Sequence, residues 1–120
     1  MLKTLIVEDS VMFRQILSET LLSRFPSMVI SEAASGNEAL RQIEAGIPDL
    51  IFMDIQLPGE NGLELTQKIK SRYPDVVIII LTNHDLPEYR EAAFRYKATH
   101  FLPKDSFLAM VDSILSASHK

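Results

Sequence analysis

Cysteine is absent from the 120 residues of this chain, which excludes a disulfide scaffold, a thiolate zinc site and a cysteine nucleophile. Long hydrophobic runs are absent too, because the longest, residues 76–81, is far shorter than a membrane span. The amino terminus lacks the charged-then-apolar layout and the small-residue cleavage site of a signal peptide. We therefore predict a cytoplasmic protein that does not enter a membrane.

Clusters of Lys and Arg are also lacking, and the formal net charge is −4. Direct binding to nucleic acid is therefore not expected, since such proteins usually present a basic patch. No internal repeat, low-complexity tract or linker interrupts the chain, and its composition (47% hydrophobic, 23% charged) is near the average for globular domains. These features predict one domain, residues 1–120.

Short apolar segments alternate with turn signals along the whole chain. Strands are predicted at residues 5–7, 28–33, 50–53, 76–81 and 100–102. Five helices are predicted after them: from the N-cap Ser10 to Pro26, from the Ser35–Glu38 capping box to Gly46, from the turn at 57–62 to about Arg72, from Pro87 to about Tyr96, and from Ser106 with Phe107, Val111, Ile114 and Leu115 facing inward. Five alternations predict an α/β fold with a parallel sheet between helices.

Polar side chains stand just after four of the five predicted strands. They are Glu8 and Asp9, then Asp54, then Thr82, and finally Lys104. In parallel sheets the carboxyl ends of the strands meet at one edge, where ligands bind beside the point of strand-order reversal. We therefore expect three carboxylates, a hydroxyl and an ammonium group to share one crevice.

Three carboxylates in one crevice repel one another, and a hard divalent cation would remove that conflict. Mg²⁺ is typically held by one or two carboxylates, waters and phosphate oxygens. Asp9 and Asp54 are the expected direct ligands, with Glu8 acting through water and a main-chain carbonyl near Gln56 completing the set. The strand-end residues therefore predict a magnesium site.

A carboxylate beside such a cation can attack phosphorus, since Asp is a known covalent nucleophile for phosphoryl groups. Phosphoryl transfer needs positioning and neutralisation of charge more than acid–base chemistry. Lys104 would add positive charge, and Thr82 could donate its hydroxyl proton to a phosphoryl oxygen. Contacts that form only after phosphorylation can shift a two-state equilibrium.

The order of these residues resembles that of a known family. Glu8-Asp9 follows the first predicted strand, Asp54 is followed by Pro58 and Gly62, and Phe101 precedes Lys104. Along essentially its full length the chain resembles the receiver domains of two-component response regulators of the chemotaxis-regulator type. The resemblance implies a flavodoxin-like, doubly wound, five-stranded parallel sheet of order 2-1-3-4-5 with five helices.

The resemblance also implies a phosphorelay function. A sensor histidine kinase or a His-containing phosphotransfer protein would donate the phosphoryl group to Asp54 in an Mg²⁺-dependent reaction. The chain would not be an enzyme in the usual sense, although it would catalyse its own phosphorylation and slow dephosphorylation. Thr82 would move toward the phosphoryl group and Phe101 would turn inward. The face built from the fourth helix, fifth strand and fifth helix would then change its partners.

Those partners lie outside this chain: an output domain or a target protein, or a second copy in a phosphorylation-dependent dimer. Several positions depart from the pattern of the family and bear on the switch. Phe101 stands where Tyr is also common, Asn83 replaces a small residue, and Lys97-Ala98 replaces Gly-Ala. Pro103 precedes Lys104, whereas many receivers have Pro after the Lys.

Each site residue taken alone has an ordinary structural explanation, such as a helix terminus for Glu8-Asp9 or a strand-end cap for Asp54. Three other functions remain open as alternatives. A haloacid-dehalogenase-type phosphatase would need a second Asp where this chain has Gln56, and an FMN carrier would need a Ser/Thr/Gly-rich loop at Glu8-Asp9. A pseudo-receiver would keep the fold and lose the site. Gln56 and His84 are the side chains expected to tune the lifetime of an aspartyl phosphate.

Overall fold

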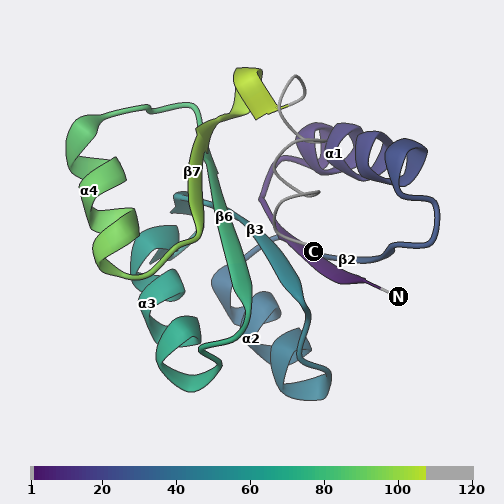
Figure 1. The fold of residues 1–120 in the computed structure, drawn as a ribbon, viewed down its shortest axis with the longest axis horizontal. Helices are drawn as coiled ribbons and strands as arrows, with labels where there is room; N and C mark the ends of the chain where they lie inside the picture. Colours follow the sequence, from purple (N-terminus) through teal and green to yellow (C-terminus); the bar gives the residue numbers. More distant parts are fainter. Residues whose placement is uncertain (1, 108–120) are drawn as a thin grey trace.

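The computed structural model describes residues 2–107 of the chain. Its helices and strands follow one another in the order β1 (Lys3–Val7), α1 (Val11–Arg24), β2 (Val29–Ala33), α2 (Gly36–Ala45), β3 (Leu50–Asp54), β4 (Gln56–Leu57), β5 (Glu60–Asn61), α3 (Gly62–Arg72), β6 (Val77–Thr82), α4 (Pro87–Arg95) and β7 (His100–Pro103). Five parallel strands form the main sheet in the order β2-β1-β3-β6-β7 (Figure 1). The predicted order 2-1-3-4-5 is therefore confirmed.

The fifth predicted helix falls mostly outside the described residues, including Val111, Ile114 and Leu115. What is described of it, residues 104–107, is helical from Lys104 onward, so the prediction that Ser106 caps this helix is wrong. Lys104 can enter the helix directly because Pro103 ends β7 just before it. Within the described residues no helix is long and apolar enough to cross a membrane.

Side chains that cap the helices fix where α1 and α2 begin. The Ser10 hydroxyl accepts a hydrogen bond from the Phe13 N–H, and the Ser35 hydroxyl accepts one from the Glu38 N–H. Glu38 reaches back to the Ala34 N–H at 2.9 Å, one residue before the N-cap, so the return bond of the predicted capping box is shifted by one residue. Both predicted caps are confirmed, and each places a strand-to-helix turn at the carboxyl edge of the sheet.

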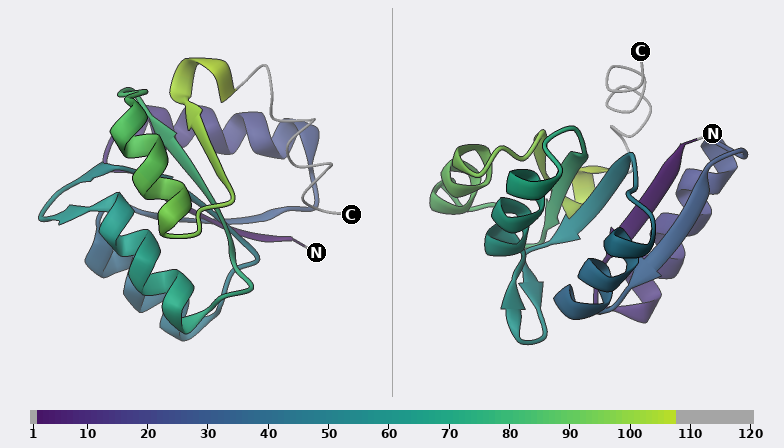
Figure 2. Two further views of the ribbon diagram at one scale, coloured as in Figure 1. Left: turned by 60° about the vertical axis from the view of Figure 1, so that its left-hand side comes forward. Right: turned by 90° about the horizontal axis from the view of Figure 1, so that it is seen from below.

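Two apolar layers cover the two faces of the sheet. Helices α2, α3 and α4 pack on one face through Ile43, Leu65, Ile69 and Ala93, whereas α1 packs on the other through Leu17 and Leu21. The separate positions of α1 and of the other helices can be followed in Figure 2. The sheet is therefore covered on both faces, as the continuous apolar strands predict.

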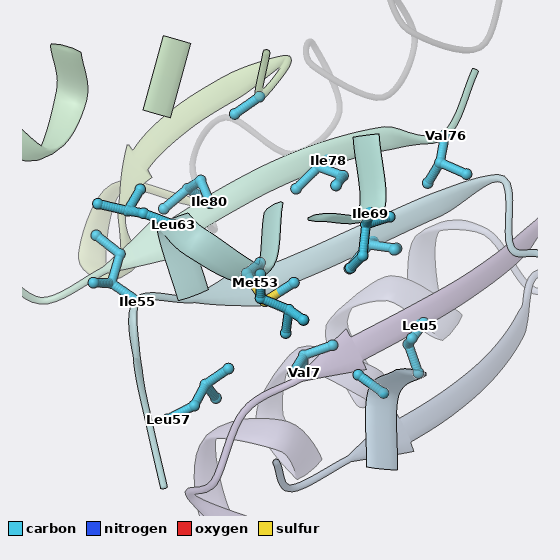
Figure 3. Packing of buried hydrophobic residues seen from close by; sticks show 14 of the residues in the cluster. Leu5, Val7, Met53, Ile55, Leu57, Leu63, Ile69, Val76, Ile78 and Ile80 are labelled. Atoms are coloured by element: carbon cyan, nitrogen blue, oxygen red, sulfur yellow. The ribbon is translucent and has the colours of Figure 1, made fainter. Parts of the chain in front are cut away.

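Alternate residues of the central strands point to the same layer. Val7 of β1, Met53 of β3 and Ile78 and Ile80 of β6 lie on the side of α3, where Ile69 meets them (Figure 3). All of these side chains are essentially buried. This packing holds β1, β3 and β6 in register, so the residues that follow them end at one level.

A small hairpin between β3 and α3 replaces the simple turn predicted at residues 57–62. Strands β4 and β5 have 2 residues each and pair in antiparallel fashion around Pro58-Gly59. Gly59 has a φ of 71°, the left-handed conformation that glycine adopts easily. A Cβ on Gly62 would lie 1.9 Å from the main-chain oxygen of Asp54, so only glycine allows α3 to start so close to the end of β3.

Candidate functional site

Three carboxylates meet at the carboxyl edge of the sheet, as the sequence predicts. Asp54 is the last residue of β3, and Glu8 and Asp9 follow β1, its neighbour in the sheet. One oxygen from each carboxylate lies within 4.8 Å of the other two. Glu8 and Asp54 are buried, with 3% and 9% of their surface exposed, whereas Asp9 is exposed. The group is therefore open to solvent on the Asp9 side.

Lys104 brings positive charge to this group from beyond β7. Its ammonium nitrogen lies 2.5 Å from Glu8 Oε1 and 3.7 Å from Asp54 Oδ2. The same ammonium lies 4.5 Å from the centre of the Phe13 ring, in a cation–π contact. Lys104 is thus directed mainly at Glu8 and is held between an α1 ring and a carboxylate.

The electrostatic environment makes Asp54 unusually hard to ionise. Burial and, next, the negative charge of Glu8 raise the pKa of the Asp54 carboxyl from 3.8 to about 6. Lys104 and main-chain hydrogen bonds from Gln56 and Ile55 lower this pKa, but they do not offset the first two effects. A carboxylate in this state gains from any added positive charge.

Glu8 is held at every one of its polar groups. Its N–H donates to the Ala33 carbonyl, and its carboxylate accepts from the Ser10 N–H and from Lys104. Its carbonyl oxygen accepts a hydrogen bond from Arg14 Nη1 at 2.7 Å. Sequence reasoning missed Arg14, because nothing in the pattern of α1 shows that this side chain turns back toward β1.

The donor set fits a hard divalent cation. Three carboxylates supply oxygen atoms that magnesium prefers, and the exposed position of Asp9 leaves room for water ligands. The Asp54 carboxyl with its raised pKa would be stabilised as a carboxylate by such an ion. The carbonyl of Gln56, at the start of β4, stays a predicted ligand.

Thr82 ends β6 and is buried, but its hydroxyl is bonded to its own loop. The Thr82 Oγ1 atom accepts a hydrogen bond from the His84 N–H at 2.9 Å and lies 3.5 Å from the His84 carbonyl. The His84 side chain is exposed. Thr82 therefore stands at the predicted edge of the sheet, and its hydroxyl proton, which has only a long 3.5 Å contact with the His84 carbonyl, is available to another acceptor while its oxygen keeps the bond from the His84 N–H.

Phe101 is already turned inward in this structure. Only 2% of its surface is exposed, and it belongs to the apolar layer on the α3 side. The Arg90 guanidinium of α4 lies 5.0 Å from the centre of the ring, and Arg90 also pairs with Asp85 at 3.1 Å. The resemblance implies that Phe101 turns inward on phosphorylation. In this conformation the side chain is already buried and does not need to turn.

Comparison with protein families gives one match over almost the whole chain. Residues 4–114 match the model of the response regulator receiver domain. The transcriptional regulatory protein DegU of Brevibacillus brevis is 31% identical over 104 residues, which cover 87% of this chain and 44% of DegU. A protein-glutamate methylesterase/protein-glutamine glutaminase of Geobacillus kaustophilus is 38% identical over 107 residues, which cover 88% of this chain and 30% of that protein.

Solved structures give the same result. A two-component response regulator of the LuxR family from Aurantimonas sp. SI85-9A1 has a TM-score of 0.87 at 29% identity, covering 98% of this chain and 85% of that one. A DNA-binding response regulator from Staphylococcus aureus, at 24% identity and a TM-score of 0.89, shares the fold over 100% of both chains. The present chain spans less than half of the length of either DegU or the methylesterase.

Proposed function

Because this chain belongs to the family of response regulator receiver domains, the phospho-accepting modules of two-component systems, we propose that Asp54 accepts the phosphoryl group. The observation that carries this proposal is the position of the Asp54 carboxyl. It ends the central strand β3, is 9% exposed, and lies close to the carboxylates of Glu8 and Asp9 and 3.7 Å from the ammonium of Lys104. Asp9, the other Asp of this group in the described part of the chain, is exposed, whereas Asp54 is buried at the end of the strand.

The transfer needs little from the protein beyond position and charge. An Asp54 oxygen attacks the phosphorus of a phosphohistidine, and the new O–P bond forms as the P–N bond breaks. The imidazole leaves with the electron pair and takes a proton from solvent. The chain would thus catalyse its own phosphorylation, although it is not an enzyme that turns over a separate substrate.

The remaining strand-end residues would stabilise charge on the phosphoryl oxygens. Lys104, 3.7 Å from Asp54, can reach an added phosphoryl group with a small movement away from Glu8. The Thr82 hydroxyl can donate to a phosphoryl oxygen once its proton turns away from the His84 carbonyl, which lies 3.5 Å away. Glu8, Asp9, Asp54 and the Gln56 carbonyl would hold Mg²⁺, which when bound supplies positive charge to the same oxygens.

Movement of Thr82 gives a route from the site to the surface. Thr82 is bonded to the His84 N–H of the loop that leads into α4, where the Arg90 guanidinium lies over the Phe101 ring. We propose that this loop carries the change to the face formed by α4 and β7 and that Phe101 acts by packing alone. A sensor histidine kinase or a His-containing phosphotransfer protein would be the donor. An output domain, a target protein or a second copy would read the changed face.

Two alternatives have less support. A haloacid-dehalogenase-type phosphatase would need an acid at position 56, where the exposed Gln56 cannot transfer a proton. A pseudo-receiver would lack the site, whereas here the three carboxylates and Lys104 are gathered together. A lasting aspartyl phosphate, rather than rapid turnover, fits this set of residues best.

Intact-mass measurement after treatment with acetyl phosphate and Mg²⁺ tests the proposal. We expect the chain to gain one phosphoryl group, to lose this gain with EDTA, and to show none in Asp54→Asn. Asp75→Asn, which changes an exposed Asp at the opposite edge of the sheet, is the matched control and should be phosphorylated like the wild type. A phosphoryl adduct that persists in Asp54→Asn would rule out Asp54 as the acceptor.

The Lys104→Ala variant provides a second test of the proposed function. Mg²⁺ binding should remain, because Lys104 is not a ligand, whereas the response of the α4–β7 face to phosphorylation should weaken. Nuclear magnetic resonance shifts of that face, recorded with and without acetyl phosphate, measure this response. If acetyl phosphate changed the shifts of this face as much in Lys104→Ala as in the wild type, the role given to Lys104 would be contradicted.

A further inference from the structure

The Asp9 carboxylate is the least constrained member of the acidic group. It is exposed, and within residues 2–107 its side chain has no hydrogen bond or ion pair. Glu8 and Asp54, in contrast, are buried and bonded. Where Asp9 lies is therefore decided by its main chain, and above all by the peptide plane that joins it to Glu8, since that plane sets the direction from which its side chain starts.

Arg14 holds that peptide plane. Its Nη1 donates to the Glu8 carbonyl at 2.7 Å, and this carbonyl lies in the same rigid plane as the Asp9 N–H. Arg14 reaches back from the first turns of α1, and only 16% of its side chain is exposed. The guanidinium is thus largely buried where it bonds to the Glu8 carbonyl.

A second contact fixes the guanidinium itself. Arg14 Nε lies 2.9 Å from Glu32 Oε1 on β2, and Ser18 Oγ donates to the other Glu32 oxygen at 3.4 Å. The planar fork of arginine allows one nitrogen to bind Glu32 and another to bind the Glu8 carbonyl, which a lysine amine could not do with the same geometry. The charge of Arg14 is largely balanced by Glu32, so its effect on the acidic group is one of position.

We propose that Arg14 is a positioning residue for the acidic pair. By holding the Glu8–Asp9 peptide in place, and with Glu32 orienting its guanidinium, Arg14 directs the Asp9 carboxylate toward the divalent cation without touching that ion. The inference rests on the proposed function, because it assigns the residue that prepares the cation site of that function. Supporting residues of this kind typically change metal affinity about 10- to 100-fold when they are removed.

Titration of the full chain with MgCl₂, followed by nuclear magnetic resonance, tests the proposal. We expect Arg14→Met to weaken Mg²⁺ binding about 10-fold, and Glu32→Gln to weaken it less, because the carbonyl bond remains but loses its orientation. Arg41→Met, on the exposed surface of α2, is the matched control and should bind as the wild type does. Wild-type affinity in Arg14→Met would overturn the proposal.

Amide exchange in metal-free protein gives a readout that does not depend on the ion. The Ser10 N–H is bonded to Glu8 Oε2 at 3.0 Å, and it should exchange several-fold faster in Arg14→Met once the peptide is released. Amides of β3 should keep their protection, which separates a local effect from general loss of stability. Unchanged Ser10 exchange would overturn the proposal even if Mg²⁺ binding fell.

Arg14→Lys separates geometry from charge. It keeps the positive charge, and we expect it to recover only part of the Ser10 protection and of the Mg²⁺ affinity, since one amine cannot replace both contacts. Full recovery would show that charge alone matters and would overturn the positioning role. If the wild type bound no Mg²⁺, the proposed function would fail, and Arg14 would lose its role toward the ion whatever the amide exchange showed.

If Arg14→Met fails to fold, the MgCl₂ titration and the amide-exchange measurement can both be made on Glu32→Gln instead. It leaves Arg14 in place and removes only the negative charge that orients the guanidinium. We then expect weaker Mg²⁺ binding together with faster Ser10 exchange. Wild-type values for both in Glu32→Gln would overturn the proposal.

Discussion

The carboxyl and amino edges of the main sheet differ in how their charged groups are matched. At the carboxyl edge, three carboxylates lie within 4.8 Å of one another, with Lys104 as the ammonium that bonds to them. At the amino edge, the charged side chains of Asp49 and Lys70 bond to main-chain groups instead. Asp49 accepts from the Lys3 N–H at 2.8 Å, and Lys70 donates to the Pro74 and Val76 carbonyls.

Each edge has one unfavourable feature: repulsion between carboxylates at the carboxyl edge and a left-handed main-chain conformation at the amino edge. Only the first of these belongs to the candidate site. At the carboxyl edge the conflict between Asp54 and Glu8 raises the pKa of Asp54 and favours binding of a cation or a phosphoryl contact. At the amino edge, Lys97 adopts a φ of 71° between α4 and β7. That conformation completes the end of α4 and touches no site residue. Removing the unfavourable feature should therefore reduce phosphorylation at the carboxyl edge and leave it unchanged at the amino edge.

The largest contrast should come from adding one methyl group to a glycine at each edge. In Gly62→Ala the new Cβ would meet the main-chain oxygen of Asp54, so β3 or α3 must move. We expect a loss of about 3 kcal/mol in the free energy of unfolding and a loss of phosphorylation. Urea denaturation and the acetyl phosphate mass assay measure the two effects.

Gly46→Ala is the matched control at the amino edge. A Cβ at Gly46 would meet nothing within 4 Å, and its backbone is extended, with a φ of −173°. Stability should change by less than about 0.5 kcal/mol. Equal destabilisation of the two variants would show that the close approach at Gly62 has no special importance.

The second contrast concerns charge. Because the pKa of Asp54 is about 6 in the fold and 3.8 without it, folding favours the protonated form. The contribution of Asp54 to stability is therefore greatest at low pH and is lost as pH rises through about 6. In metal-free buffer near neutral pH, Asp54→Asn should be more stable than the wild type by about 1–3 kcal/mol.

The advantage of Asp54→Asn should shrink as pH falls from about 6 and disappear below about pH 3, where the wild-type carboxyl is protonated in both states. Chemical denaturation of both proteins across this pH range gives the difference directly. A constant difference at every pH would mean that burial of charge at Asp54 is not its cause. Added Mg²⁺ should reverse the order, since only the wild type has the Asp54 carboxylate.

The smallest effect is expected at Lys97. The Lys97 N–H bonds to the Phe94 carbonyl and the Ala98 N–H to the Ala93 carbonyl, the pattern of a helix end that usually carries glycine. Lys97→Gly should raise stability by about 1 kcal/mol and leave phosphorylation unchanged. It should also raise the pKa of Lys70, which is lowered mainly by burial and further by the charge of Lys97.

Thermal denaturation and nuclear magnetic resonance titration of Lys70 check these two results. A drop in stability would show that the Lys97 side chain makes a favourable contact that offsets its backbone strain. Slower phosphorylation would show that the end of α4 is coupled to the site. Either outcome would remove the distinction drawn between the two edges.

Most of the fold could be predicted from the sequence because local signals and burial agree. The fully apolar strands β3 and β6, the Ser10 and Ser35 caps and Pro87 at the start of α4 all favour the observed elements. The β4–β5 hairpin could not be foreseen in the same way, since strands of 2 residues have no periodicity. Pro58-Gly59 was the signal that marked its turn.

The site was predictable to the level of which residues gather, but not of how they are held. Residues that follow parallel strands must meet at one edge, so Glu8, Asp54 and Lys104 could be brought together from their positions alone. The bond from Arg14 to the Glu8 carbonyl depends on the direction of one side chain across a loop. The contact of the Arg90 guanidinium with the Phe101 ring likewise depends on the direction of one side chain, which no spacing reveals.

The ion pair between Glu8 and Lys104 joins residues 96 positions apart in the chain. One follows the first strand and the other the last strand, so the pair forms only after β7 has docked beside β6. Contacts between such distant residues are among the slowest to form. A partly folded chain would therefore present Asp54 without its lysine. The ability to respond to phosphorylation should therefore appear late in folding, and a nascent or damaged receiver domain would lack it.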